Sequence, residues 1–132
     1  MITQLDIFDK FFEILNVTSL TNIIDGGIYK LKKPQNSELQ DIVINSLPLK
    51  SDHFVGIQNG TININCYCKN INGQPDTLTL KAISDQVLLL LEAYPQGTRF
   101  LNYDIEDMQT FQELQQNSMS FFNFKINIHL NK

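Results

Sequence analysis

Few residues of this 132-residue chain stand at spacings that support catalysis. His53 and His129 lie far apart in the sequence, and no Ser, Cys or carboxylate stands at a spacing typical of a catalytic dyad. Cys66 and Cys68 share one face of any strand, but no second Cys pair or nearby His completes a zinc site. We interpret the histidines as surface residues and the cysteines as small buried residues in a reducing compartment. We therefore expect no enzymatic activity, no metal and no cofactor.

An acidic cluster follows the strand expected at residues 99–105. Asp104, Glu106 and Asp107 form this cluster, and carboxylates so close in sequence can ligate Mg²⁺ or Ca²⁺. The simplest interpretation is a solvated strand exit. A third interpretation is an acidic lining or a charged contact with a neighbouring subunit.

The charge balance argues against sequence-specific DNA binding. The net charge is −4, and the ten cations are nine Lys and Arg99, whereas a DNA reader carries a basic face and several Arg. A neutral or acidic wall past which DNA slides remains compatible, because such a wall does not hold phosphates. Lys30, Lys32 and Lys33 form a charged strand edge or a contact for an acidic neighbour.

Two amphipathic helices are predicted. Thr3, with Asp6 three residues later, indicates a helix start, and the helix ends near Asn16. Its apolar residues recur at three- and four-residue steps: Leu5, Phe8, Phe12 and Leu15, widened by Phe11 and Ile14. The second helix begins after Pro75 with Asp76 or Thr77 as its cap. Its expected buried stripe is Leu80, Ile83, Val87, Leu90 and Leu91, and Leu88 makes its C-terminal half apolar nearly all round.

Alternating apolar and polar residues predict the strands. The expected strands are Ile28–Lys33, Asp41–Leu47, Thr61–Lys69, Arg99–Ile105 and Met119–Leu130. Residues 106–117 read as a polar loop or short helical turn. The order of elements favours one α+β domain over residues 1–132: a mainly antiparallel sheet of four to five strands, with two helices on one face.

Residues 49–60 form an extended loop or a short hairpin in this interpretation, and Asn59-Gly60 is a tight-turn signal. Apolar residues in such a polar, Gly-containing excursion either fold back onto the sheet or meet a partner chain. The candidate assembly contacts are Asp52, His53, Phe54, Val55 and Ile57.

Signals for export or membrane insertion are not expected. The first residues show no cationic stretch followed by an apolar one. The longest purely apolar run, Val87–Leu91, is far shorter than the about 20 residues that span a bilayer. We expect no contact with a membrane.

The pattern of elements resembles the tail terminator, or tail completion, proteins of long-tailed bacteriophages, including minor structural proteins of the head–tail joint. The resemblance runs from about Leu5 to Leu130. It rests on Gly26 to Tyr29 after the first helix, Pro34, Ile42 to Ile44, Ile62 to Cys68, Leu80 to Leu91, and the final strand rich in Phe and Ile. No single residue carries over as a site residue of the family.

This resemblance implies a small subunit that assembles with copies of itself into a ring, commonly a hexamer. The ring caps the tail tube protein, faces the head connector protein and lets DNA pass without specific binding. It implies a place in the tail or neck of the virion, and in the host cytoplasm during assembly. Residues 49–60 match, in position, an extended loop that such proteins use for assembly. The alternative is a small cellular adaptor, assembly chaperone or ligand-binding α+β domain.

Overall fold

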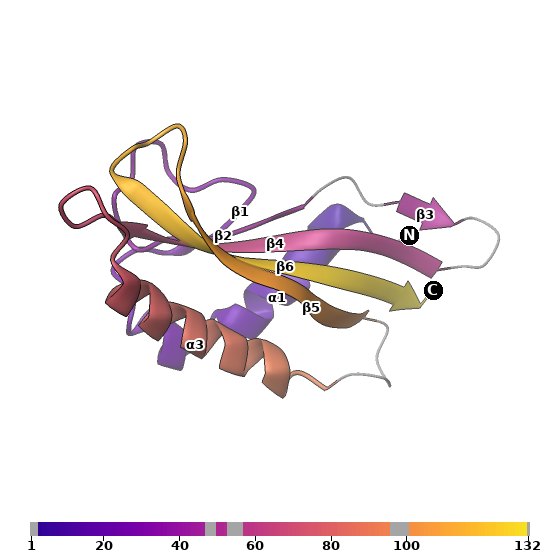
Figure 1. Ribbon diagram of the computed structural model, residues 1–132. Coiled ribbons are helices and arrows are strands. Elements are labelled where there is room, and N and C mark those ends of the chain that lie inside the picture. Colours follow the sequence, from indigo (N-terminus) through magenta and orange to yellow (C-terminus); the bar gives the residue numbers. More distant parts are fainter. Residues whose placement is uncertain (1–2, 47–49, 53–56, 96–100, 132) are drawn as a thin grey trace.

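The computed structural model describes residues 3–46, 50–52, 57–95 and 101–131. Helices α1 (Gln4–Leu15) and α2 (Thr18–Thr21) come first, and α3 (Thr77–Ala93) separates the first four strands from the last two. Figure 1 shows the long strands as one twisted sheet with α3 running beside it.

The described strands form one six-stranded sheet. They are β1 (Ile28–Lys30), β2 (Ile42–Ser46), β3 (Lys50–Asp52), β4 (Ile57–Lys69), β5 (Leu101–Gln112) and β6 (Met119–Asn131). Five of them lie in the order β1-β2-β4-β6-β5, and β3 pairs with β4 off this path. The β1–β2 pair is parallel and the other pairs are antiparallel. The α+β class and the mainly antiparallel sheet are therefore confirmed, with one strand more than expected.

Both predicted helix starts are confirmed. The backbone N–H of Thr3 donates a hydrogen bond of 2.8 Å to the Asp6 carboxylate, which satisfies a donor that the first turn of α1 leaves unpaired. Asp76 caps α3, because its carboxylate accepts a hydrogen bond from the backbone N–H of Thr79 at 3.2 Å. These caps therefore determine the residues at which the two long helices begin.

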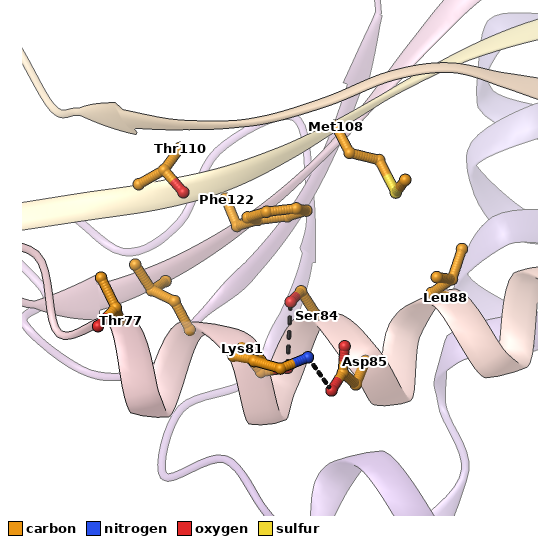
Figure 2. Close-up of a pocket in the computed structure, with 9 residues that line it drawn as sticks. Thr77, Lys81, Ser84, Asp85, Leu88, Met108, Thr110 and Phe122 are labelled. Carbon is orange, nitrogen blue, oxygen red and sulfur yellow. Dashed lines mark hydrogen bonds and ion pairs between the residues drawn. The ribbon is translucent and has the colours of Figure 1, made fainter.

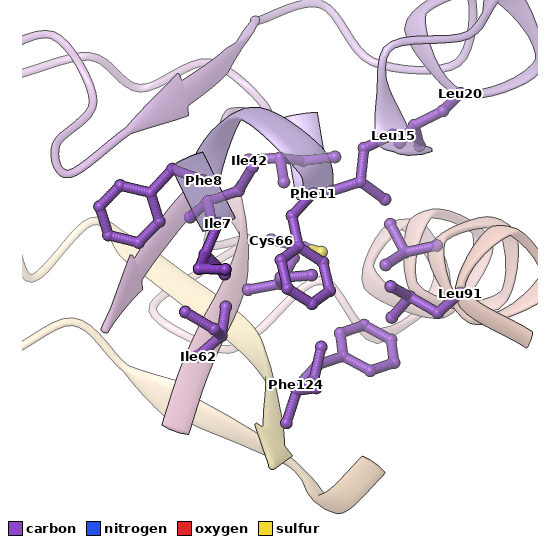
Figure 3. Packing of buried hydrophobic residues seen from close by; sticks show 14 of the residues in the cluster. Ile7, Phe8, Phe11, Leu15, Leu20, Ile42, Ile62, Cys66, Leu91 and Phe124 are labelled. Carbon is purple, nitrogen blue, oxygen red and sulfur yellow. The ribbon is translucent and has the colours of Figure 1, made fainter. Parts of the chain in front are cut away.

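One apolar core joins α1, α3 and alternate residues of the sheet (Figure 3). Its fully or almost fully buried members include Phe8, Phe11 and Leu15 of α1, Ile83, Val87 and Leu91 of α3, and Ile42, Ile62, Ile64, Cys66, Phe124 and Ile126 of the sheet. Ile62 lies opposite Ile126, and Ile64 lies opposite Phe124. The core residues of the strands therefore point to one side of the sheet.

The predicted helix stripes need correction at particular residues. Leu5 is 58% exposed, whereas Ile7 is fully buried, so the stripe of α1 is rotated away from Leu5. On α3, Leu91 belongs to the core but Leu90 is only partly buried. Leu89 is 62% exposed, so the C-terminal half of α3 is not covered on all sides.

Three predicted strand limits are wrong, each for a physical reason. β5 continues to Gln112 where a loop was predicted, because pairing with the long β6 carries it through a bulge between Ile105 and Asp107. β1 ends at Lys30 because Leu31 adopts a φ of 74°. Asn59-Gly60 is no turn: pairing with His129 and Ile128 of β6 holds it within β4. Long-range pairing overrides local turn preference at this site.

The segment at residues 49–60 contains the short hairpin that the sequence left open. Lys50, Ser51 and Asp52 of β3 pair with Asn59, Gln58 and Ile57 of β4. The hairpin lies at the end of the sheet where β6 finishes, as Figure 1 shows.

Candidate functional site

The sheet face opposite the core has two parts. Val43, Tyr67, Met119 and Phe121 form a small apolar cluster, and beside it the register brings amide and charged side chains together in a polar region. We call this region the polar face, and its described members are Asn45, Asn63, Asn65, Asp104, Asp107, Gln109, Asn123, Lys125, Asn127 and His129. Asn65 of β4 lies opposite Asn123 of β6, which lies opposite Gln109 of β5. The Asn123 amide donates hydrogen bonds to the side-chain oxygens of Asn65, at 2.7 Å, and Asn63, at 3.3 Å.

The predicted acidic cluster lies within β5 and not at a strand exit. Asp104 and Asp107 face Asn127 and Lys125 of β6, and Glu106 sits at the bulge between the paired residues. The bulge adds one residue to β5, so Glu106 reaches the same side as its neighbours and pairs with Lys125 at 2.9 Å. The three carboxylates therefore form an acidic strip along the free edge strand of the polar face.

Ion pairs balance part of this acidic strip. The hydrogen bond and charge of Lys125 hold the pKa of Glu106 below its ordinary value, and Glu106 raises the pKa of Lys125. His129 lies 3.5 Å from Asp104. The Asp107 carboxylate accepts hydrogen bonds from the Gln109 amide and the Met108 backbone N–H. Among the described residues, Asp107 is the carboxylate of the three that has no cation within salt-bridge distance.

Metal binding by the acidic strip finds no support in this geometry. Among the described residues, no three His, Cys, Asp or Glu side chains lie close enough together to hold a metal ion. Alternate positions of a strand are about 7 Å apart, so the carboxylates spread along β5.

The two cysteines lie in the core side of β4. Both are buried free thiols, and burial raises the pKa of Cys66 to about 12 and of Cys68 to about 11. A thiol nucleophile needs the thiolate at neutral pH. These side chains therefore act as small apolar residues.

The candidate assembly contacts at the hairpin divide into two groups. The structure places Asp52 and Ile57 as backbone partners, at the point where β3 meets the start of β4. His53, Phe54 and Val55 lie outside the described residues.

A groove of about 380 Å³ opens between α3 and the strands β5 and β6 (Figure 2). Leu80, Leu88, Met108 and Phe122 give it an apolar lining. The Lys81–Asp85 ion pair, at 2.9 Å, lies on its helix side. The groove could not be found from the sequence, because Met108 was assigned to a loop and the order Met-Gln-Thr-Phe at residues 108–111 has no apolar–polar alternation that would indicate a strand.

The lysine-rich segment does not form one strand face as predicted. Lys30 pairs with Asp9 of α1 and lies over the Phe12 ring, whereas Lys33 donates to the Ser37 carbonyl at 2.6 Å. The chain turns between them at Leu31, because the backbone N–H of Lys32 bonds to the carbonyl of Lys30.

A second, polar hollow of about 430 Å³ lies beside this turn. Lys33 and Gln116 line it and bond to each other at 3.0 Å. Tyr67 donates to Glu113 at 3.2 Å, and burial with the nearby Glu113 charge raises the pKa of Tyr67. These groups satisfy one another and present no obvious chemistry.

Comparisons with known proteins identify no family. No protein-family model matches the sequence, and a search of curated proteins finds no match either. Within the described residues, no helix has the length and apolar character needed to cross a membrane.

Proposed function

We propose that this chain is a structural subunit of a bacteriophage tail, of the tail terminator or tail completion type. Copies assemble into a ring, commonly a hexamer, at the head-proximal end of the tail or at the head–tail joint. The tail tube protein and the head connector protein are its partners, and the ring performs no catalysis. The subunit belongs to the tail or neck of the virion, after assembly in the host cytoplasm.

The observation that carries this proposal is the polar face with its acidic strip. A channel wall must let DNA slide, so it must not hold phosphates. Amides and carboxylates dominate this face, and both Lys125 and His129 lie beside a carboxylate. Such a face repels phosphates or leaves them hydrated. We assign it to the wall of the DNA passage.

The unpaired sheet edges also support an assembling subunit. In the described sheet, β5 pairs only with β6, so its other edge leaves backbone donors and acceptors available over Leu101–Gln112. Such edges pair with further chains unless they are shielded. A subunit with a long open edge on one side is suited to contact a neighbour in a ring.

Disruption of the gene in a phage-producing host tests the proposal. We expect filled heads and tails to accumulate unjoined, and we expect a plasmid copy of the intact chain to restore infectious particles. A plasmid carrying a stop codon in place of Gln4 serves as the control. Unchanged yields of infectious particles after disruption would contradict the proposal and favour a cellular adaptor or chaperone.

A further inference from the structure

We propose that the groove between α3 and β5 receives the Leu31 turn of a second copy of this chain, so that subunits associate head to tail. The Leu31 turn consists of residues 30–33. This inference rests on the ring in the proposed function and specifies which surfaces of two subunits meet.

The groove has the features of a docking site for one apolar side chain. Met108 is 45% exposed although it lines the groove with the partly buried Phe122 and Leu88. Figure 2 shows Met108 and Thr110 across the groove from the residues of α3, and both belong to β5, which pairs only with β6 among the described strands. A chain that approaches this edge therefore meets an apolar recess and open backbone groups together.

Leu31 is an exposed apolar side chain, called the knob here, near the opposite edge of the sheet from β5. It follows β1, the strand at the other end of the order β1-β2-β4-β6-β5. Its side chain is 52% exposed, and its φ of 74° is unusual for a bulky residue. The Lys32 N–H to Lys30 carbonyl bond of 2.9 Å closes a γ-turn of the rare, strained kind. Strain of this kind concentrates where surfaces have a binding role.

The charges around the two surfaces are complementary. Lys32 follows Leu31 directly, whereas Lys30 pairs with Asp9 and the Lys33 ammonium donates to the Ser37 carbonyl and Gln116. Lys32 is therefore the cation that the knob offers to a second copy.

On the edge strand β5, Glu106 pairs with Lys125 and Asp104 lies beside His129, so Asp107, next to Met108, is the carboxylate offered to Lys32. Asp107 and Met108 are neighbours on the edge strand and point to opposite faces of the sheet. A second chain that lies along this edge can therefore contact both side chains. Opposite charges orient such an encounter and exclude the reverse pairing of like edges.

The knob and the groove are different surfaces of the subunit, so a contact between them is compatible with a ring. They lie at opposite ends of the strand order, so one molecule cannot join its own knob to its own groove. Each interface uses different surfaces of the two subunits, and a repeated contact of this kind closes into a ring when its rotation permits closure. Knob and groove therefore provide a heterologous contact that a ring requires.

Cysteine cross-linking tests the contact directly. Full-length Leu31→Cys and Met108→Cys proteins are purified, mixed and treated at pH 7 with a short bis-maleimide reagent. The native thiols do not compete, because Cys66 is fully buried and Cys68 is 3% exposed. We expect a covalent dimer from the mixture and a ladder of multimers from the double variant. The matched control is Ile71→Cys mixed with Met108→Cys, since Ile71 is 57% exposed.

Three results would overturn the proposal: no dimer from the mixture at high protein concentration, equal dimer from either variant alone, or equal dimer from the Ile71→Cys control. Asp107→Lys in the Met108→Cys protein should lower the dimer yield about threefold, as expected for one exposed charge pair. Lys32→Glu in the Leu31→Cys partner should restore it. Failure of this rescue would show that Lys32 of one copy and Asp107 of the other do not orient the two subunits, which contradicts the proposed contact.

The two proposals fail in different ways. A cross-linked ladder from a protein that is missing from virions would leave the contact intact and refute the phage function. A protein present in virions without the 31–108 cross-link would retain the function and refute the contact.

Discussion

The side-chain amide of Asn123 in β6 donates a hydrogen bond of 2.7 Å to the side-chain oxygen of Asn65 in β4. Asn65 is 8% exposed on the sheet face opposite the core. The bond ties two strands whose sequences are far apart, and it satisfies an amide that burial would otherwise penalise. The polar face is therefore an ordered part of the fold.

Loss of this amide pair should weaken the fold. Asn123→Ala leaves the nearly buried Asn65 oxygen without its partner, so we expect the free energy of unfolding to fall by about 1 kcal/mol. Asn117→Ala is the matched control, because Asn117 is exposed and contributes only its backbone carbonyl to the bond with Asn70. Urea denaturation measures both. Equal stability of the two variants would show that the Asn123–Asn65 hydrogen bond does not stabilise the fold.

Adjacent leucines of α3 should respond very differently to truncation. Leu91→Ala removes a core side chain, so we expect a loss of about 2–5 kcal/mol. Leu89→Ala removes an exposed side chain and should change stability by less than about 0.5 kcal/mol. Denaturant unfolding of both proteins measures the difference. Similar losses would show that the face assigned to the core is wrong.

The cap of α3 should give a specific dependence of stability on pH. Hydrogen bonds from Thr79 lower the pKa of Asp76 below its ordinary value of 3.8. The charged cap therefore contributes fully above pH 3.8 and loses its contribution as the pH falls through the lower folded-state pKa. At pH 7, Asp76→Ala should cost about 1 kcal/mol.

Asp76→Asn provides the control for this pH effect. Asn is an effective cap without a titrating carboxylate, so the advantage of wild type over this variant should shrink on acidification below pH 3.8. Thermal unfolding at several pH values measures the difference. A constant difference at all acidic pH values would contradict the role of the charged cap.

The cysteines should be protected from alkylation in the folded protein. Because burial raises the pKa of Cys66 to about 12, almost no thiolate exists at pH 8. We expect iodoacetamide to label Cys66 only as fast as the protein unfolds, and both cysteines to react at once in denaturant. Mass spectrometry follows the labelling. Rapid labelling of Cys66 under native conditions would show that its site is open.

The acidic strip predicts a charge effect on particle assembly. Asp104→Lys should lower the yield of infectious particles, because the new cation would hold phosphates in the DNA passage. Asp107, which the proposed subunit contact uses, stays intact in this variant. Glu92→Lys makes the same kind of charge change at an exposed position on α3 and should leave the yield unchanged. Complementation of the disrupted gene measures both. Equal yields would show that the polar face does not line the DNA passage.

The sequence predicts much of this fold where local signals agree. Asp76 after Pro75 and the apolar spacing of α3 predict that helix correctly, and the alternation of Phe124, Ile126 and Ile128 predicts the buried side of β6. Both elements bury a regular apolar pattern. Their positions therefore follow from periodicity and capping alone.

The candidate site depends on pairing that local patterns do not encode. β5 extends beyond Ile105 because β6 offers a long partner, and the bulge near Glu106 has no signal in the sequence. That register creates both the acidic strip and the groove at Met108. Leu31 was assigned to a strand because its neighbours alternate, but the structure turns the backbone there to a φ of 74°.

Fractionation of phage particles tests whether this chain is a component of the virion. Virions from the native host are banded on a density gradient and searched for this chain by quantitative mass spectrometry, with the major tail protein as the internal standard. We expect the chain to band with the particles at a few copies each, as one ring per tail requires. Its absence from the particles, with the protein left in the soluble fraction, would contradict the account.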